Sequence, residues 1–183
     1  MAQFLRPDSN VTQTSFTGGF ANIDEASASD ADFAYGANST AAVLEVGLGN
    51  PTGTPASGTT TIRYRIAKVN NGTLNGSGSS LTVTCELYEG STLIASDAAR
   101  TPTGTWTAYS FAPDMSGVTD WTDLRLRFTT SVSGGNTSNR RGGAVNTARQ
   151  YPLAGALQSF PLSRCGPHCP LEGVRQRYPL GAA

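Results

Sequence analysis

The alternation of apolar and polar residues along the chain predicts a series of short β-strands. Over residues 81–88, apolar side chains occupy every second position, with threonine, glutamate and tyrosine between them. A two-residue period places the apolar side chains on one face of an extended strand, which is typical of a half-buried sheet. The same period predicts strands at 42–48, 62–66 and 124–128. Three further segments are predicted as strands: 19–23, 92–97 and 105–111.

Glycine, proline and asparagine separate the predicted strands and mark the turns. Gly49-Asn50-Pro51 and Pro102-Thr103-Gly104 are two of these breaks, and Glu89-Gly90 is typical of a tight hairpin. The connections are too short for the helical crossovers that a parallel sheet requires. We therefore predict an all-β fold, an antiparallel, jelly-roll-like β-sandwich.

The C-terminal part of the chain lacks this periodicity. It holds five prolines after residue 149, which forbid long helices and favour an extended course. Residues 141–148 offer a short closing strand for the sandwich. We expect a sandwich domain over residues 1–139, reaching about 148 if the closing strand forms, and an extended Pro/Arg-rich C-terminal arm over 149–183.

Charge is distributed unevenly between these two parts. The chain carries 13 basic and 13 acidic side chains, so its net charge is zero, which gives no general attraction to nucleic acid or to an anionic membrane. Residues 1–139 nevertheless carry −5 and residues 140–183 carry +5. Segments of opposite sign predict that the basic segment docks on an acidic partner or neighbouring subunit. The expected contact residues are Arg140, Arg141, Arg149, Arg164, Arg175 and Arg177.

The sequence shows neither a transmembrane segment nor a secretory signal. No stretch approaches the roughly 18 consecutive apolar residues that span a bilayer, so we expect no membrane partner. The residues after Met1 lack the basic and apolar regions of a signal peptide. We therefore expect no export through a signal peptide, although the Ser/Thr/Gly-rich composition resembles that of an extracellular protein.

Metal binding has two weak candidates in the sequence. Cys165, His168 and Cys169 place two thiols and an imidazole within five residues, but a structural zinc site needs four ligands and no second pair exists. Two free thiols, or a local disulfide in oxidising surroundings, are favoured instead. The acidic run from Asp24 to Asp32 lacks the spacing of a calcium loop, and a solvated loop is favoured there. We predict no metal ion or other cofactor.

Catalysis has one serious candidate. The only histidine, His168, lies in the arm, away from the predicted strands, so a histidine-assisted nucleophile is not expected. A glycosidase needs two carboxylates roughly 5–9 Å apart in a cleft, and Glu45 and Glu86 are the plausible pair. Both lie on the face opposite the apolar residues, and cross-strand ion pairs with arginines are favoured. We therefore predict no catalytic residue. The arginines on equivalent faces are Arg63, Arg65, Arg125 and Arg127.

Two tryptophans are candidate contacts for a glycan. Trp106 and Trp121 lie near predicted strand boundaries, where an indole ring can stack on a sugar ring. Packing at the rim of the core is the more common role of such residues. The low aromatic content, 8% of the chain, also argues against a sugar cleft.

Four strings of residues occur in a fixed order along the chain. They are Arg6-Pro7-Asp8-Ser9-Asn10-Val11, Ile23-Asp24-Glu25 followed by Ser29-Asp30-Ala31-Asp32-Phe33, Thr61-Ile62-Arg63-Tyr64-Arg65, and Asp123-Leu124-Arg125-Leu126-Arg127-Phe128. Together they resemble small jelly-roll virion structural proteins of tailed bacteriophages, and the resemblance covers roughly residues 5–132. Such domains close with one more alternating strand, and the chain departs from this pattern after about residue 138.

The resemblance implies a β-sandwich displayed on a virus particle and transfers no catalytic residue. A phage structural protein leaves its host by lysis and needs no signal peptide. We therefore expect a virion protein, a capsid decoration or cement protein whose basic arm docks on the shell or a neighbouring subunit. Its expected partners are the major capsid protein, other virion proteins and further copies of itself. A carbohydrate-binding module of a head fibre or tail appendage is the first alternative, and a small glycoside hydrolase is the second.

Overall fold

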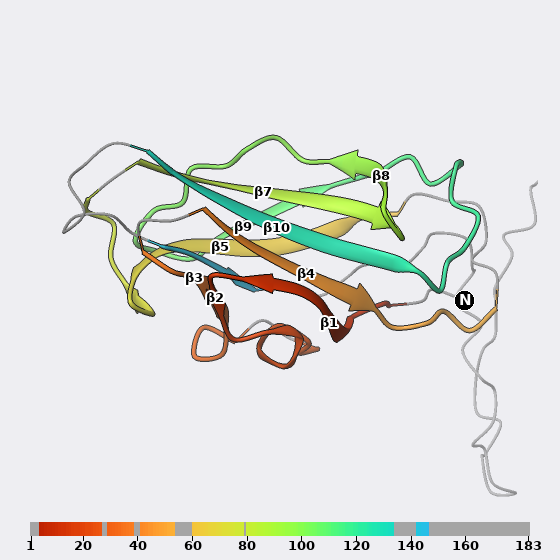
Figure 1. Ribbon diagram of the computed structural model, residues 1–183, viewed down its shortest axis with the longest axis horizontal. Helices are drawn as coiled ribbons and strands as arrows, with labels where there is room; N and C mark the ends of the chain where they lie inside the picture. The colour runs from red at the N-terminus through yellow and green to blue at the C-terminus, as the bar shows by residue number, and fades with distance from the viewer. Residues whose placement is uncertain are drawn as a thin grey trace, which may run out of the picture.

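Two antiparallel sheets pack face to face in the computed structural model, so the predicted all-β sandwich is confirmed (Figure 1). The structure describes residues 4–26, 29–38, 41–53, 60–78, 80–133 and 142–146. The predicted arm, residues 149–183, lies outside these ranges. Among the described residues, no helix has the length and hydropathy needed to cross a membrane.

Among the described residues, the first sheet, sheet A, has five strands in the order β1-β4-β10-β7-β8. The long strands β4, β10 and β7 occupy its centre, and the polar strand β1 and the short strand β8 form its edges. A two-residue loop, Gly90-Ser91, joins β7 to β8, which confirms the predicted hairpin. The bounds are β1 Pro7–Thr14, β4 Ala42–Leu48, β7 Ser80–Glu89, β8 Thr92–Ser96 and β10 Leu124–Ser133.

The second sheet, sheet B, has six strands in the part of the chain that the structure describes, with the order β2-β3-β11-β5-β6 along its main path. The sixth, β9, pairs with β5 on the side away from β11. The bounds are β2 Phe16–Thr17, β3 Ala34–Gly36, β5 Ile62–Asn70, β6 Thr73–Leu74, β9 Thr107–Phe111 and β11 Gly142–Asn146.

The core between the sheets consists of the apolar residues that the alternation predicted. On β7, Leu81, Val83, Cys85 and Leu87 are all at most 1% exposed, and the residues between them on 82–86 are more exposed. Most of the buried hydrophobic residues lie on β4, β5, β7 and β10. Full burial of an aliphatic or aromatic side chain contributes roughly 1.5–3 kcal/mol. Burial also raises the pKa of Cys85 well above its ordinary value, so its thiol is an inert part of the core.

The prediction of a strand at residues 19–23 was wrong, because this segment forms a short 3₁₀ turn, η1, at Phe20–Asn22. Side-chain amides satisfy its backbone in place of a sheet neighbour. The Gly19 N–H donates to Asn22 Oδ1 at 3.0 Å, and the Phe20 N–H donates to Asn10 Oδ1 at 2.8 Å. Such local side-chain bonds compete with strand formation.

β11 lies in the interval 141–148, where the sequence offered a closing strand. It occupies an inner position of sheet B, with Val145 opposite Ile66 on β5 and Ala144 opposite Tyr35 on β3. Val145 and Ala144 are fully buried. The strand is therefore an integral part of the sandwich, and the folded unit extends through residue 146.

A polar cluster ties one edge of the two sheets together. The hydroxyl of Tyr64, on β5 of sheet B, donates to Asp97 Oδ2 at 2.5 Å. Asp97 follows β8 of sheet A and accepts from Arg100 Nη2 at 2.8 and 3.1 Å. The Arg100 guanidinium also lies 4.9 Å from the ring centroid of Tyr109, which stacks on Tyr64. We refer to Tyr64, Asp97 and Arg100 as the inter-sheet cluster.

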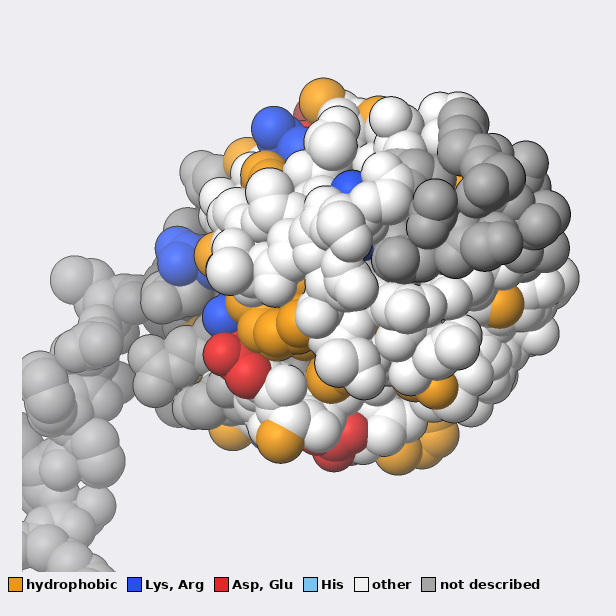
Figure 2. Space-filling model, turned by 90° about the vertical axis from the view of Figure 1, so that its left-hand side faces the viewer, with side chains coloured by type: hydrophobic (Ala, Val, Ile, Leu, Met, Phe, Trp, Pro, Cys, Tyr) orange, Lys and Arg blue, Asp and Glu red, His pale blue; other side chains and the backbone are white. Residues whose placement is uncertain are grey.

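The two ends of the sandwich differ in charge. Figure 2 shows the end at which β4 begins and β10 finishes, and most of the described surface there is uncharged. At the other end, Asp120 and Asp123 precede β10, and Glu89 finishes β7. We refer to this second end as the acidic end of the sandwich.

Candidate binding pocket and the outer face of sheet A

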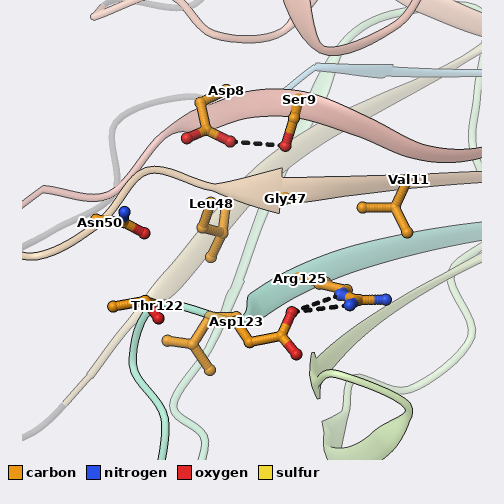
Figure 3. Close-up of a pocket in the computed structure, with 10 residues that line it drawn as sticks. Asp8, Ser9, Val11, Gly47, Leu48, Asn50, Thr122, Asp123 and Arg125 are labelled. Atoms are coloured by element: carbon orange, nitrogen blue, oxygen red, sulfur yellow. Dashed lines mark hydrogen bonds and ion pairs between the residues drawn. The ribbon is translucent and has the colours of Figure 1, made fainter.

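A polar pocket lies at the acidic end of the sandwich, where β1, β4 and β10 approach one another (Figure 3). Its volume is about 280 Å³. Asp8 and Ser9 enter it from β1, Asn50 from the segment after β4, and Arg125 from β10. Most of these side chains are exposed or half-buried, so the pocket is open to solvent.

A glycine and a β-bulge create this pocket. Pro7 pairs with Leu48 and Ser9 pairs with Gly47, so Asp8 is an extra residue in β1 without a partner in register. Bulges of this kind redirect a side chain from the regular sheet surface. A Cβ atom at Gly47 would lie 2.4 Å from Ser9 Oγ and 3.3 Å from Asp8 Oδ1. The absence of a side chain at position 47 therefore leaves room for Asp8 and Ser9.

Hydrogen bonds fix some of the polar groups of the pocket and leave others available. The Ser9 hydroxyl donates to Asp8 Oδ1 at 2.9 Å. Arg125 donates to Asp123 Oδ1 from Nε at 3.0 Å and from Nη2 at 2.8 Å, and these bonds raise the pKa of the guanidinium. Asp8 Oδ2, the amide of Asn50 and the N–H groups of Arg125 that these bonds do not use are thus the groups with capacity for a ligand.

A network of charged side chains continues from the pocket across the outer face of sheet A. Glu45, on β4, is only 3% exposed and contacts both arginines of β10. Arg125 Nη1 lies 3.5 Å from its Oε1, and Arg127 Nη2 lies 2.6 Å from its Oε2. Arg127 also lies 4.0 Å from the ring centroid of Tyr88 on β7. The predicted pairing of Glu45 with cross-strand arginines is therefore confirmed.

Glu86 has a different environment from the one predicted. It lies opposite Arg127 in the register of β7 and β10, but the Arg127 guanidinium turns toward Glu45. The hydroxyl of Tyr88 donates to Glu86 Oε2 at 3.3 Å instead. Arg63 and Arg65 lie on β5 of sheet B, so they form no continuous stripe with the arginines of β10.

The two tryptophans belong to segments on different sheets. Trp106 precedes β9 and meets Phe33 edge to face, with ring centroids 5.2 Å apart. The Arg65 guanidinium lies 5.5 Å from the Trp106 ring centroid and forms an ion pair with Asp30. Trp121 precedes β10 and packs, partly buried, against the hydrophobic core. Both tryptophans thus make packing contacts.

The remaining predicted site residues divide into two groups. Within the part of the chain that the structure describes, no group of three or more His, Cys, Asp or Glu side chains is arranged to hold a metal ion. In the acidic run, Asp32 accepts from the Asn22 amide at 2.7 Å, and Asp30 pairs with Arg65. The candidate residues of the segment 140–183 lie outside the described ranges: Arg140, Arg141, Arg149, Arg164, Cys165, His168, Cys169, Arg175 and Arg177.

Comparisons with known proteins assign the chain to no family. No protein-family model matches the chain, and no curated protein sequence matches it. Among solved structures, an arabinose-bound GH51 α-L-arabinofuranosidase aligns with 82% of this chain at 14% identity and a TM-score of 0.36. The alignment spans only 26% of that structure. At this TM-score the likeness carries no argument about function.

The pocket is not among the sites predicted from the sequence, although two features of the sequence lie in it. Gly47 interrupts the outward-facing positions of an otherwise regular strand, and a glycine within a strand often marks a bulge or a close approach of another chain segment. The first and fourth resemblance strings, residues 6–11 and 123–128, both contribute to the pocket lining. Only the strand order, β1-β4-β10, brings these two strings together.

Proposed function

We propose that this protein is a bacteriophage virion structural protein, a capsid decoration or cement protein whose basic arm docks on the shell or on a neighbouring subunit. The β-sandwich architecture supports the proposal, because the resemblance implies a domain of this type. The proposed partners are the major capsid protein, other virion proteins and further copies of the chain. The proposed location is the virion.

The observation that carries the proposal is how the resemblance strings meet in space. Strings 6–11 and 123–128 line one pocket. Strings 23–33 and 61–65 are joined by the ion pair between Asp30 and Arg65. Residues that carry the resemblance therefore lie beside one another in the fold although they are far apart in the sequence, which supports a shared architecture.

The acidic end of the sandwich offers a surface for a basic arm. Glu89 accepts from the Thr119 hydroxyl at 2.5 Å and from the Asp120 N–H at 2.6 Å, and these bonds, with the Thr119 side chain first, lower the pKa of Glu89. Hydrogen bonds from Thr122 likewise lower the pKa of Asp120. Both carboxylates are therefore negatively charged at neutral pH. Because their hydrogen bonds come from neutral groups, these bonds do not cancel the negative charge. An arginine-rich arm from a neighbouring subunit is complementary to this surface.

We expect the arm to be required for retention on particles. The full chain should co-sediment with purified particles, and a chain that ends at Asn146 should be retained at least about tenfold less. The matched control is a full-length chain in which serine replaces the four arginines after residue 146, which tests charge apart from length. Raising the salt concentration to about 0.5 M should release the full chain, because salt screens surface charges.

Equal retention of the full and shortened chains would contradict the role of the arm. Loss with the shortened chain but not with the serine variant would show that the arm attaches through contacts other than its charge. The four substituted positions are Arg149, Arg164, Arg175 and Arg177.

A further inference from the structure

We propose that the pocket between β1, β4 and β10 binds a neutral sugar residue through Asp8, Asn50 and Arg125. This binding site differs from the tryptophans that the sequence suggested as glycan contacts. The proposal concerns the isolated sandwich and does not depend on the role of the arm or on the attachment of the protein to a particle.

The size of the pocket suits a small ligand. Pockets for drug-sized molecules are roughly 300–1,000 Å³, and this pocket is about 280 Å³. A single sugar residue, at the end of a chain or as a branch, matches this volume. The open side of the pocket leaves the rest of a glycan in solvent.

The polar groups match the hydroxyls of a sugar. A hydroxyl both donates and accepts, so it needs acceptors and donors in one place. Asp8 Oδ2 is a charged acceptor, since the Ser9 hydroxyl engages only Oδ1. The Asn50 amide supplies both a donor and an acceptor, and Arg125 supplies N–H groups at the inner wall. Two adjacent hydroxyls of a sugar can therefore bond to a carboxylate and an amide together.

The charge of the pocket favours a neutral ligand over an ion. Asp8 and Asp123 line the pocket and Glu45 lies behind Arg125, so an anion meets more negative than positive charge. The Arg125 guanidinium repels a metal cation, and its ion pair with Asp123 already neutralises the charge of that carboxylate. In addition, the described residues offer no cluster of three carboxylate, thiol or imidazole ligands. A polyhydroxyl compound satisfies the polar groups without adding charge.

Apolar side chains in the pocket complement the carbon face of a sugar ring. Val11, on β1, lines the pocket and is 42% exposed, whereas Leu48, which also lines it, is 5% exposed and packs in the core. A sugar ring presents C–H groups on its faces and hydroxyls at its rim. The Val11 side chain can therefore pack on a face of the ring, and the Asp8 carboxylate and the Asn50 amide can bond to the hydroxyls at its rim.

The test uses an array of neutral and acidic glycans, followed by calorimetry with the neutral sugar that gives the strongest signal. We expect the full chain to bind neutral glycans. Asp8→Asn removes the charged acceptor with little change of shape and should weaken binding about tenfold or more. Asn50→Ala should weaken binding to a similar degree. Asp114→Asn, an exposed carboxylate away from the pocket lining, is the matched control and should bind like the unchanged chain.

Three results would overturn this proposal. The first is an array without binding to any neutral glycan. The second is binding that Trp106→Ala abolishes and Asp8→Asn leaves unchanged, since the glycan then occupies the other sheet. The third is calorimetric binding of CaCl₂ that is lost in Asp8→Asn, which would make the pocket a cation site. Asp8 and Asn50 are exposed, so we expect their variants to fold normally. The melting temperature of each variant checks this.

Discussion

A chain that ends at Asn139 is expected to lose its cooperative unfolding transition, and a chain that ends at Asn146 is expected to keep it. The seven residues between these ends include β11, which separates β3 from β5 in sheet B. Without β11, the hydrogen-bonding edge of β5 is exposed and the β2–β3 pair loses its place in the sheet. Thermal and urea unfolding, followed by circular dichroism, measure the difference directly.

The size of this effect follows from burial. Val145 and Ala144 are fully buried, and their loss opens the core beside Ile66 in addition to removing a set of backbone hydrogen bonds. A domain of this size is stable by only roughly 5–15 kcal/mol, so the loss of an inner strand is comparable to the whole stability. Equal unfolding transitions for the two chains would contradict the placement of β11.

A single substitution provides an independent check on β11. A Cβ atom at Gly142 would lie 1.9 Å from the carbonyl oxygen of Gly36, which is backbone and cannot rotate away. Gly142→Ala should therefore lower the melting temperature sharply. Gly117→Ala is the matched control, because a Cβ atom there has no neighbour within 4 Å.

Replacement of Asp97 by alanine is expected to destabilise the sandwich by about 2–4 kcal/mol, because it leaves the Tyr64 hydroxyl and the Arg100 guanidinium without their shared partner. Asp97 is 9% exposed and joins the two sheets through these bonds. Asp30→Ala is the matched control. It breaks an ion pair whose carboxylate side chain is 61% exposed, and such surface pairs contribute less than about 1 kcal/mol. Equal losses for the two variants would contradict the importance of the inter-sheet cluster.

The contribution of Asp97 should also depend on pH. Burial raises the pKa of Asp97, but hydrogen bonds from Arg100, Tyr64 and the Ala98 N–H outweigh it and hold the pKa below its ordinary value. A carboxylate with a lowered pKa in the folded state adds stability above its unfolded pKa of about 3.9, and this stability disappears as the pH falls through the folded value. The difference in free energy of unfolding between the unchanged chain and Asp97→Asn should therefore narrow below about pH 4.

The central strands could be predicted from the sequence because their periodicity directly reflects burial. β7 and β10 alternate regularly, and each is covered by the core on one face. β1 gave no such signal, because only Pro7 of its eight residues is buried. β11 begins with Gly142-Gly143, a pair that is typical of turns. The close approach of Gly36 to Gly142, and of Thr130 and Val83 to Gly143, explains the two glycines. Period alone does not detect a polar edge strand or a glycine-rich inner strand.

The candidate pocket could not be predicted, because its two sides are far apart in the sequence. Asp8 and Arg125 come together only through the pairing of β1 and β10 with β4. The ion pairs of Glu45 were easier to foresee, because arginines at alternate positions of one strand commonly face a glutamate on the next. The local sequence pattern thus predicts which face of a sheet a side chain occupies. The order of the strands determines which residues of other strands it contacts.

The position of β11 also changes the division of charge along the chain. Arg140 and Arg141 precede β11, so the unit that ends at residue 146 carries −3 and residues 147–183 carry +3. The contrast is smaller than the one obtained by dividing the chain at residue 139, but its sign is unchanged. The proposed arm, residues 149–183, follows β11 and holds four of the six arginines of the basic segment 140–183.

The most direct test of the proposed virion role is to locate the protein on particles. Antibodies raised against the sandwich and labelled with gold should decorate purified particles at repeated positions on the head, as seen by electron microscopy. Label confined to the tail would replace the decoration role with that of an appendage. Particles without label, from lysates in which the protein remains in the soluble fraction, would contradict the proposal.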